Sequence, residues 1–363
     1  MQEMALTPRR IAVDGMGGDY APGVVVQGAA QAVTDFDLEI VLVGQEQLLK
    51  RELAKHKIPG GRITVHHASQ VVDMGESPVQ AIRKKKDSSV AVCIDLLKQK
   101  AVDAVVTAGN TGAAVAASTL NLGLLPGIKR PGIVVSIPTL HGISLAIDVG
   151  ANVDPTPEHL FQYALMGDIY SRSICKKRRP AIGLLNVGEE ESKGTTVTKE
   201  AYKLLRESDF NFIGNIEGRD FFTGKCDVIV CDGFVGNIVL KLTEGLFENL
   251  VEFIKKELSQ NYLAQLGSFL CKSALLNIRK EANYEEAGGG QLLGLNGVVI
   301  ISHGSSTAWA IRNAIKKAAQ VVEFDVNGHI VTEITQRDKS KAEAGNHSSA
   351  NSKPAQPHAD DKK

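Results

Sequence analysis

Residues 11–22 read Ile11-Ala12-Val13-Asp14-Gly15-Met16-Gly17-Gly18-Asp19-Tyr20-Ala21-Pro22, a short apolar run followed by a glycine-rich turn. A second apolar run, with the spacing of a helix, extends from Val24 to Val33. Three glycines between a strand and a helix leave backbone N–H groups uncovered, and the start of a helix adds a partial positive charge. The stretch therefore predicts the first strand, turn and helix of an α/β fold, with a turn suited to an anion. The alternative is an ordinary tight turn that needs glycine at positive φ.

Length and composition set outer limits on the class of protein. The chain has 363 residues, with 41 Lys and Arg against 41 Asp and Glu, so no global charge favours nucleic acid as a partner. The five cysteines are odd in number and form no C-x-x-C pair, which argues against a disulfide framework. We find no signal-peptide pattern and no run of about 18 apolar residues that could span a bilayer. The sequence thus predicts a cytoplasmic globular enzyme.

Short β-branched runs alternate with helical stretches along most of the chain, which predicts a mainly parallel sheet covered on both faces. We expect a Rossmann-like, three-layer α/β/α fold. The expected strands are 11–13, 38–43, 63–65, 104–107, 133–137, 145–147, 182–185, 212–213, 228–230 and 298–301. The expected helices are 24–33, 47–56, 79–100, 159–175, 198–207, 234–276 and 305–322.

Glycine and asparagine follow six of these strands, where ligands bind in parallel sheets. Together the six turns predict one crevice lined with backbone donors and small amides. They are Asp14–Gly18, Gly109–Gly112, Asp148–Asn152, Asn186–Gly188, Asp232–Asn237 and His303–Ser306.

Several common site motifs are missing from the sequence. There is no Walker A motif, no G-x-G-x-x-G after the first strand, no G-x-S-x-G and no H-E-x-x-H. The remaining polar groups are glycine turns, asparagines, Lys193 and His303, which suit an oxyanion and a transition state with negative charge on a carbonyl oxygen. A metal-dependent dehydrogenase of similar fold and a non-catalytic membrane-associated scaffold for carrier proteins are the competing interpretations.

The motifs, taken in order, closely resemble those of the bacterial phosphate acyltransferases of phospholipid synthesis. The matching segments are Ile11–Pro22, Arg83–Lys86, Ala108–Ala113, Asp148–Asp154, Gly183–Gly188, Asp232–Asn237 and His303–Ser306. The resemblance implies transfer of a long-chain fatty acyl group from acyl carrier protein to inorganic phosphate. It also implies a fold similar to phosphotransacetylases and isopropylmalate dehydrogenases, a homodimer, no metal and no organic cofactor. Peripheral contact with the cytoplasmic membrane face, and with the downstream glycerol-3-phosphate acyltransferase, is implied as well.

We assign hypothetical roles to the polar residues of the six turns. Lys193 is the first choice for the charge on phosphate and Asn237 for a donor to the oxyanion. His303 either donates a proton to the leaving thiolate or only orients Asn237 or a glycine turn. A solvated ion pair is the alternative for Lys193, and helix caps or turn formation are the alternatives for the aspartates and Asn152. The phosphate- and substrate-binding candidates are Asp14, Gly15, Gly17, Gly18, Asn110, Thr111, Gly112, Asn152, Asp232 and Gly233.

Three further segments carry predictions about partners and domain organisation. Either of two basic runs, Arg83–Lys86 and Lys176–Arg179, could guide an acidic carrier protein, and solvated surface is the alternative. Apolar residues repeat with helical spacing after Tyr262, which suits lipid or a dimer seam. We expect one catalytic domain over residues 1–334, a helical dimerisation and membrane segment at about 236–283, and a disordered tail over 335–363, where no Leu, Ile, Val or Phe occurs.

Overall fold

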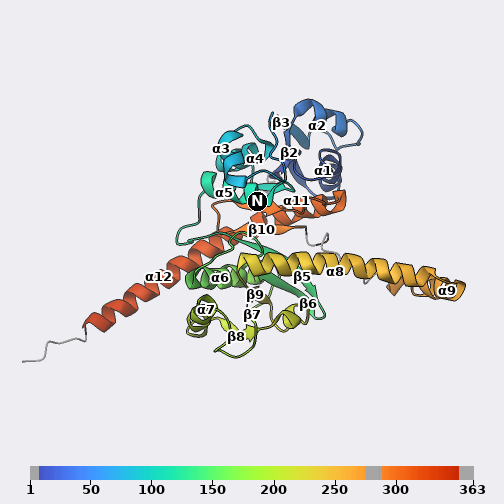
Figure 1. Cartoon of the computed structure of the whole chain (residues 1–363). Helices are drawn as coiled ribbons and strands as arrows, with labels where there is room; N and C mark the ends of the chain where they lie inside the picture. The colour runs from blue at the N-terminus through green and yellow to red at the C-terminus, as the bar shows by residue number, and fades with distance from the viewer. Residues whose placement is uncertain (1–7, 275–285, 287, 351–363) are drawn as a thin grey trace, which may run out of the picture.

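A computed structural model describes residues 8–274, 286 and 288–350 of the chain (Figure 1). Within these residues, eleven strands form one continuous sheet. Across the sheet the strands lie in the order β3 (Ile63–His67), β2 (Leu38–Gly44), β1 (Arg9–Asp14), β4 (Ala104–Thr107), β11 (Val298–Ile301), β10 (Gly290–Leu293), β5 (Gly132–Thr139), β6 (Gly142–Ile147), β9 (Val228–Val230), β7 (Ala181–Leu185) and β8 (Asn211–Ile216).

Helices cover both faces of the sheet, and each face has its own apolar core. Neighbouring residues of β1 divide between the two cores, with Ile11 and Val13 in one and Ala12 in the other. The first core is closed by α1 (Gly23–Asp35), α2 (Glu46–Leu53), α6 (Pro157–Ser173), α7 (Thr196–Arg206), α11 (Ala308–Glu323) and α12 (Val326–Ala350). The second is closed by α3 (Pro78–Lys84), α4 (Ser89–Lys98), α5 (Thr111–Asn121), the 3-10 helix η1 (Gly218–Phe222) and the start of α8 (Gly233–Ser259).

Strand direction changes in the middle of the sheet, and this change creates the crevice. The pairs β11–β10, β10–β5 and β5–β6 are antiparallel, whereas the strands on either side run parallel within each set. Ile301 ends β11 opposite Gly290, and Ile147 ends β6 opposite Val134, which also faces Gln291. The carboxyl ends of both parallel sets therefore meet near one level of the sheet, where ligands are expected.

The structure confirms the mainly parallel α/β/α sheet but differs from the expected elements at four places. β10 and α5 were not predicted. The helix expected over 79–100 is divided into α3 and α4, because the backbone at Ser88 pairs with Gln70, which donates to the carbonyl oxygen of Asp87 at 3.0 Å and accepts from the N–H of Ser89 at 3.1 Å. The helix expected over 234–276 ends at Ser259, and Asn261 begins a new one, α9 (Tyr262–Leu270), by accepting from the N–H of Ala264. Residues 275–283 of the expected helical segment lie outside the described residues.

The C-terminal region also differs from the expected tail. Disorder was predicted from residue 335, but α12 continues to Ala350, and residues 351–363 lie outside the described residues. The lack of Leu, Ile, Val and Phe after residue 334 did not predict this helix, because α12 contacts the body of the molecule through the charge of Arg337. Arg337 pairs with Asp209 at 2.7 Å and its guanidinium lies 4.5 Å from the ring centre of Phe210.

Candidate active site

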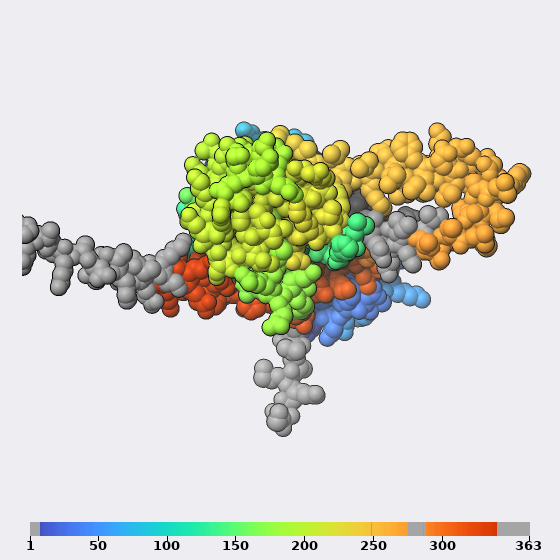
Figure 2. Space-filling model, turned by 90° about the horizontal axis from the view of Figure 1, so that it is seen from below, coloured from blue at the N-terminus to red at the C-terminus, as the bar shows by residue number. Residues whose placement is uncertain are grey.

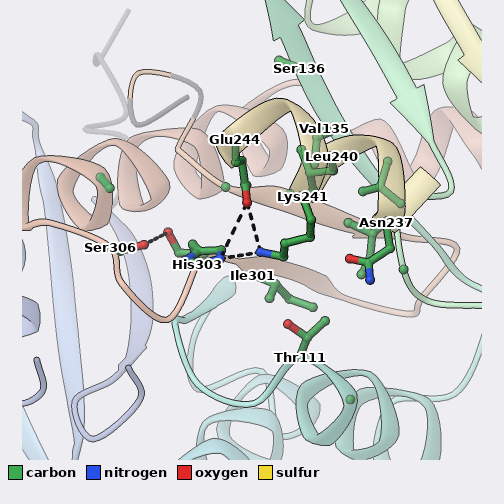
Figure 3. Close-up of a pocket in the computed structure, with 18 residues that line it drawn as sticks. Thr111, Val135, Ser136, Asn237, Leu240, Lys241, Glu244, Ile301, His303 and Ser306 are labelled. Atoms are coloured by element: carbon green, nitrogen blue, oxygen red, sulfur yellow. Dashed lines mark hydrogen bonds and ion pairs between the residues drawn. The ribbon is translucent and has the colours of Figure 1, made fainter. Parts of the chain in front are cut away.

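A cavity of about 340 Å³ lies where the two sets of strands converge (Figure 3). This volume is in the range of small-molecule sites. Apolar and polar side chains both line it, so the cavity can hold both an acyl group and a charged one. The apolar lining residues are Ile133, Val135, Val149, Leu240, Ile301 and Ala310, and the polar ones are Thr111, Ser136, Asn237, Lys241, Glu244, Ser302, His303 and Ser306.

Three charged or ionisable side chains meet in this cavity and point toward one another (Figure 3). The ammonium of Lys241 lies 3.0 Å from Oε2 of Glu244 and contacts Nε2 of His303. The same carboxylate oxygen lies 3.8 Å from Nε2 of His303. On the other side of the ring, Nδ1 accepts from the backbone N–H of Ser305 at 3.2 Å and lies 2.7 Å from Oγ of the same residue, so Ser305 holds the imidazole in place.

Helix α8 presents Asn237, Lys241 and Glu244 on one face, since residues three and four apart are neighbours on a helix. The carboxylate of Asp232 caps the helix by accepting from the N–H of Val235 at 2.8 Å. The carboxamide of Asn237 has no hydrogen-bond partner within the described residues. It is therefore available to a ligand in the cavity.

The start of α8 is packed closely against the turn that follows β6. The N–H of Gly233 donates to the carbonyl oxygen of Asn152 at 2.8 Å. A Cβ at Gly236 would overlap the carbonyl oxygen of Asp148, so only glycine permits this approach. Asp232, Gly233 and Asn152 thus position α8 and are not among the residues that line the cavity.

Asp148 holds the same turn together from its centre. Its buried carboxylate accepts from the backbone N–H groups of Ile133, Gly150, Ala151 and Asn152 at 2.7–3.1 Å. Burial raises the pKa of this carboxyl to about 6, and the four N–H groups oppose that rise. The helix-capping and turn-forming interpretation of this aspartate fits these contacts.

The N-terminus of α5 supplies the opposite side of the cavity, through Thr111 and Gly112. The first N–H groups of a helix have no partner within it and carry partial positive charge. Asn110 caps this helix by accepting from the N–H of Ala113 at 2.9 Å. Its amide also donates to the carbonyl oxygens of Asp73, Met74 and Glu76 at 3.0–3.3 Å, so its role is positioning.

The glycine turn at residues 14–18 does not line the cavity. Three of its backbone N–H groups already have acceptors in the protein. Gly15 donates to the carbonyl oxygen of Val43, Met16 to the carboxylate of Asp14, and Gly17 to the carbonyl oxygen of Asp14. The carboxyl of Asp14 is buried, which raises its pKa, and it accepts from the hydroxyl of Thr107 at 2.8 Å. Gly18, at φ +107°, packs on the backbone of Gly304, so this turn supports the loop that carries His303.

Lys193 is also outside the cavity. It lies in the turn after β7, two strands from β6, with its ammonium 4.0 Å from the Glu190 carboxylate and its side chain 52% exposed. The cation that the structure brings into the cavity is Lys241, which the sequence reasoning missed together with Glu244. The signal was present, because Asn237, Lys241 and Glu244 have the spacing of one helix face.

The structure brings no group of three or more His, Cys, Asp and Glu into a metal-binding arrangement, as far as residues 8–274 and 286–350 are described. None of the helices in that part of the chain is both long and apolar enough to cross a membrane.

Comparisons with known proteins agree with this fold. A family model described as "Fatty acid synthesis protein" matches residues 9–329. The phosphate acyltransferase of Desulfitobacterium hafniense is 50% identical over 315 residues, or 86% of this chain and 94% of the relative. That of Geotalea daltonii is 48% identical over 325 residues, or 90% of this chain and 94% of the relative. A phosphotransacetylase structure from Streptococcus pyogenes gives a TM-score of 0.59 at 21% identity, over 87% of this chain and 94% of that one.

The phosphotransacetylase structure shows the fold, and relatives named phosphate acyltransferases, at 48–50% identity over most of the chain, show that it is an acyltransferase. The sequence identities narrow this class further. The chain belongs to the phosphate acyltransferase family of fatty acid and phospholipid synthesis. The resemblance seen in the sequence motifs is confirmed.

Proposed function

We propose that the cavity transfers a long-chain fatty acyl group from the thioester of an acyl carrier protein to inorganic phosphate. The observation that carries the proposal is the convergence of Lys241, Asn237, His303 and the N-terminus of α5 in a cavity that apolar side chains also line. The cationic and hydrogen-bonding groups suit an anion, and the apolar side chains suit the acyl end of a thioester.

In this proposal the site binds and orients more than it activates, because phosphate is already an anion near neutral pH. One N–H of the Lys241 ammonium meets Glu244 and one meets His303, so a third remains for phosphate. Thr111 and the N–H groups at the start of α5 face phosphate from the other side. No metal and no organic cofactor enters the proposed reaction.

In the proposed reaction, a phosphate oxygen forms a bond to the carbonyl carbon of the thioester while the carbon–sulfur bond breaks. The products are acyl phosphate and a thiol. The proton that hydrogen phosphate loses is gained by sulfur, and His303 is proposed to relay it. Asn237 donates to the carbonyl oxygen as negative charge grows there. The leaving thiolate becomes a thiol with a pKa of about 8.5, so a proton donor assists its departure near neutral pH.

The test of this function is release of free carrier thiol from an acylated acyl carrier protein. We expect release to depend on added inorganic phosphate and to yield acyl phosphate in equal amount. A scaffold without catalysis would bind the acylated carrier and release no thiol. Phosphate-independent release would also contradict the proposal, because water would then be the acceptor.

We propose that the carrier docks at α3. Pro78 of this helix packs against Gly112, at the edge of the cavity, and Arg83 and Lys84 are exposed less than two turns further on. Lys176–Arg179 instead precedes β7, at the end of that strand away from its carboxyl end. An acidic carrier that binds Arg83 and Lys84 would be close to the cavity.

The outer parts of α8 and α9 project from the body of the molecule (Figures 1 and 2). The face of α8 opposite Lys241 exposes Ile238, Leu242, Leu246 and Phe253. We propose that a second copy of the chain covers this stripe in a homodimer, with the pairing centred on the region of residues 247–256. Covering it would remove apolar area from water.

For α9 we propose peripheral contact with the cytoplasmic membrane face. Tyr262, Leu263, Leu266, Phe269 and Leu270 share one face and are all more than half exposed. Replacement of Leu266 by Glu is expected to lower binding to anionic phospholipid vesicles by at least about tenfold, measured by co-sedimentation. Ser268→Glu, on the opposite face of α9, adds the same charge and serves as the control. Unchanged binding of Leu266→Glu would rule out lipid contact at this face.

A further inference from the structure

Glu244 is a carboxylate placed among the groups that we propose to bind phosphate. Its side chain is only 16% exposed, and its Oε2 meets both Lys241, at 3.0 Å, and His303, at 3.8 Å. It comes from the same face of α8 as Lys241 and lines the cavity itself (Figure 3). A negative charge in an anion site opposes binding, so its presence requires a chemical reason.

The two oxygens of Glu244 differ in their contacts. Oε2 takes both interactions with the neighbouring cationic and imidazole groups. Oε1 makes no hydrogen bond within the described residues. An ionised carboxylate can only accept, so Oε1 is matched to a ligand that brings a hydrogen.

Oxyanions of similar size differ in whether they bring one. Inorganic phosphate and arsenate keep at least one O–H near neutral pH, whereas sulfate has none. Against sulfate, the carboxylate would face a bare oxygen and the two charges would repel. A site built around a hydrogen bond rejects analogues that lack the hydrogen more strongly than a site that measures size alone.

We propose that Glu244 selects protonated phosphate over sulfate and other fully deprotonated oxyanions, by accepting the phosphate O–H at Oε1. Lys241 and the N-terminus of α5 supply the opposing positive charge, so the carboxylate is tolerated only when the ligand donates to it. This role is a specificity role and rests on the proposed function, since it concerns the acceptor subsite of the same cavity.

The test compares the full-length wild type with Glu244→Gln, and measures binding of inorganic phosphate, arsenate and sulfate by calorimetry in the absence of thioester. We expect the wild type to bind phosphate and arsenate at least about tenfold more tightly than sulfate. In Glu244→Gln the amide can donate to sulfate, so the ratio is expected to fall by at least about tenfold. The gain of sulfate binding is a readout that loss of folding would not produce.

Two further variants make the result decisive. Glu200→Gln removes an exposed carboxylate on α7, away from the cavity, and is expected to keep the wild-type ratio. Glu244→Asp keeps the acceptor and is expected to retain preference for phosphate. A wild type that binds sulfate as well as phosphate, or a Glu244→Gln variant with the wild-type ratio, would overturn the assignment.

The binding test is separate from the test of the reaction. Phosphate-dependent thiol release with an unchanged anion preference in Glu244→Gln would leave the proposed function in place and remove the role of Glu244. Selective phosphate binding without thiol release would support the role of Glu244 and contradict the proposed function.

Discussion

Replacement of Lys241 by alanine is expected to lower kcat/KM for phosphate-dependent thiol release by at least about a hundredfold, because the variant loses the cation that faces both phosphate and the growing negative charge. The ammonium contacts His303 and Glu244 within the cavity, so no neighbouring cation can replace it there. Steady-state kinetics with varied phosphate measure the effect, and both a higher KM and a lower kcat are expected.

Two other lysines serve as controls for this result. Lys203 lies on α7, exposed and away from the cavity, and Lys203→Ala is expected to change kcat/KM by less than about threefold. Lys193 is the residue that the sequence favoured, and Lys193→Ala is expected to behave like Lys203→Ala. A hundredfold loss in Lys193→Ala with little loss in Lys241→Ala would return the catalytic role to Lys193 and contradict our assignment.

Replacement of Asp148 by alanine is expected to lower the free energy of unfolding by at least about 3 kcal/mol, since each buried donor left without its acceptor costs about 1 to 3 kcal/mol. Four backbone N–H groups depend on this carboxylate. Activity should fall as well, because the turn at 149–152 supports the start of α8 through Gly233. Urea denaturation followed by circular dichroism measures the stability change.

Asp154→Ala provides the matched control, since Asp154 is exposed six residues further along the same loop region. Its free energy of unfolding is expected to stay within about 0.5 kcal/mol of the wild type. An Asp148→Ala variant as stable as Asp154→Ala would show that water satisfies the four N–H groups, and that the turn does not need its central carboxylate.

The fold could be predicted because the apolar runs report burial directly. Segments such as 38–43 and 298–301 are continuous and β-branched, and the structure has strands there. β10 escaped prediction because Gly290-Gln291-Leu292-Leu293 has no alternation and follows a run of glycines. The division of 79–100 depends on the backbone pairing of Gln70 with Ser88, a contact that periodicity within the segment cannot reveal.

The site could be predicted in part, for a physical reason. Thr111, Gly112, Asn237 and His303 were found because they follow strands whose carboxyl ends meet. A strand end shows at which edge of the sheet a residue lies, but not how far along that edge it lies from the cavity. Lys193 was therefore included, although it follows β7, two strands away from β6. Lys241 and Glu244 were missed because they follow no strand. They reach the cavity about two and three turns into α8, along a helix whose direction depends on the fit of Gly236 against Asp148.

Helix α8 turns Asn237 and Lys241 inward while Ile238 and Leu242 face out. If a second copy covers this outer face, as proposed, its contact with α8 also bears on how far the ammonium of Lys241 reaches into the cavity. We therefore expect an isolated chain at high dilution to lose activity before it unfolds.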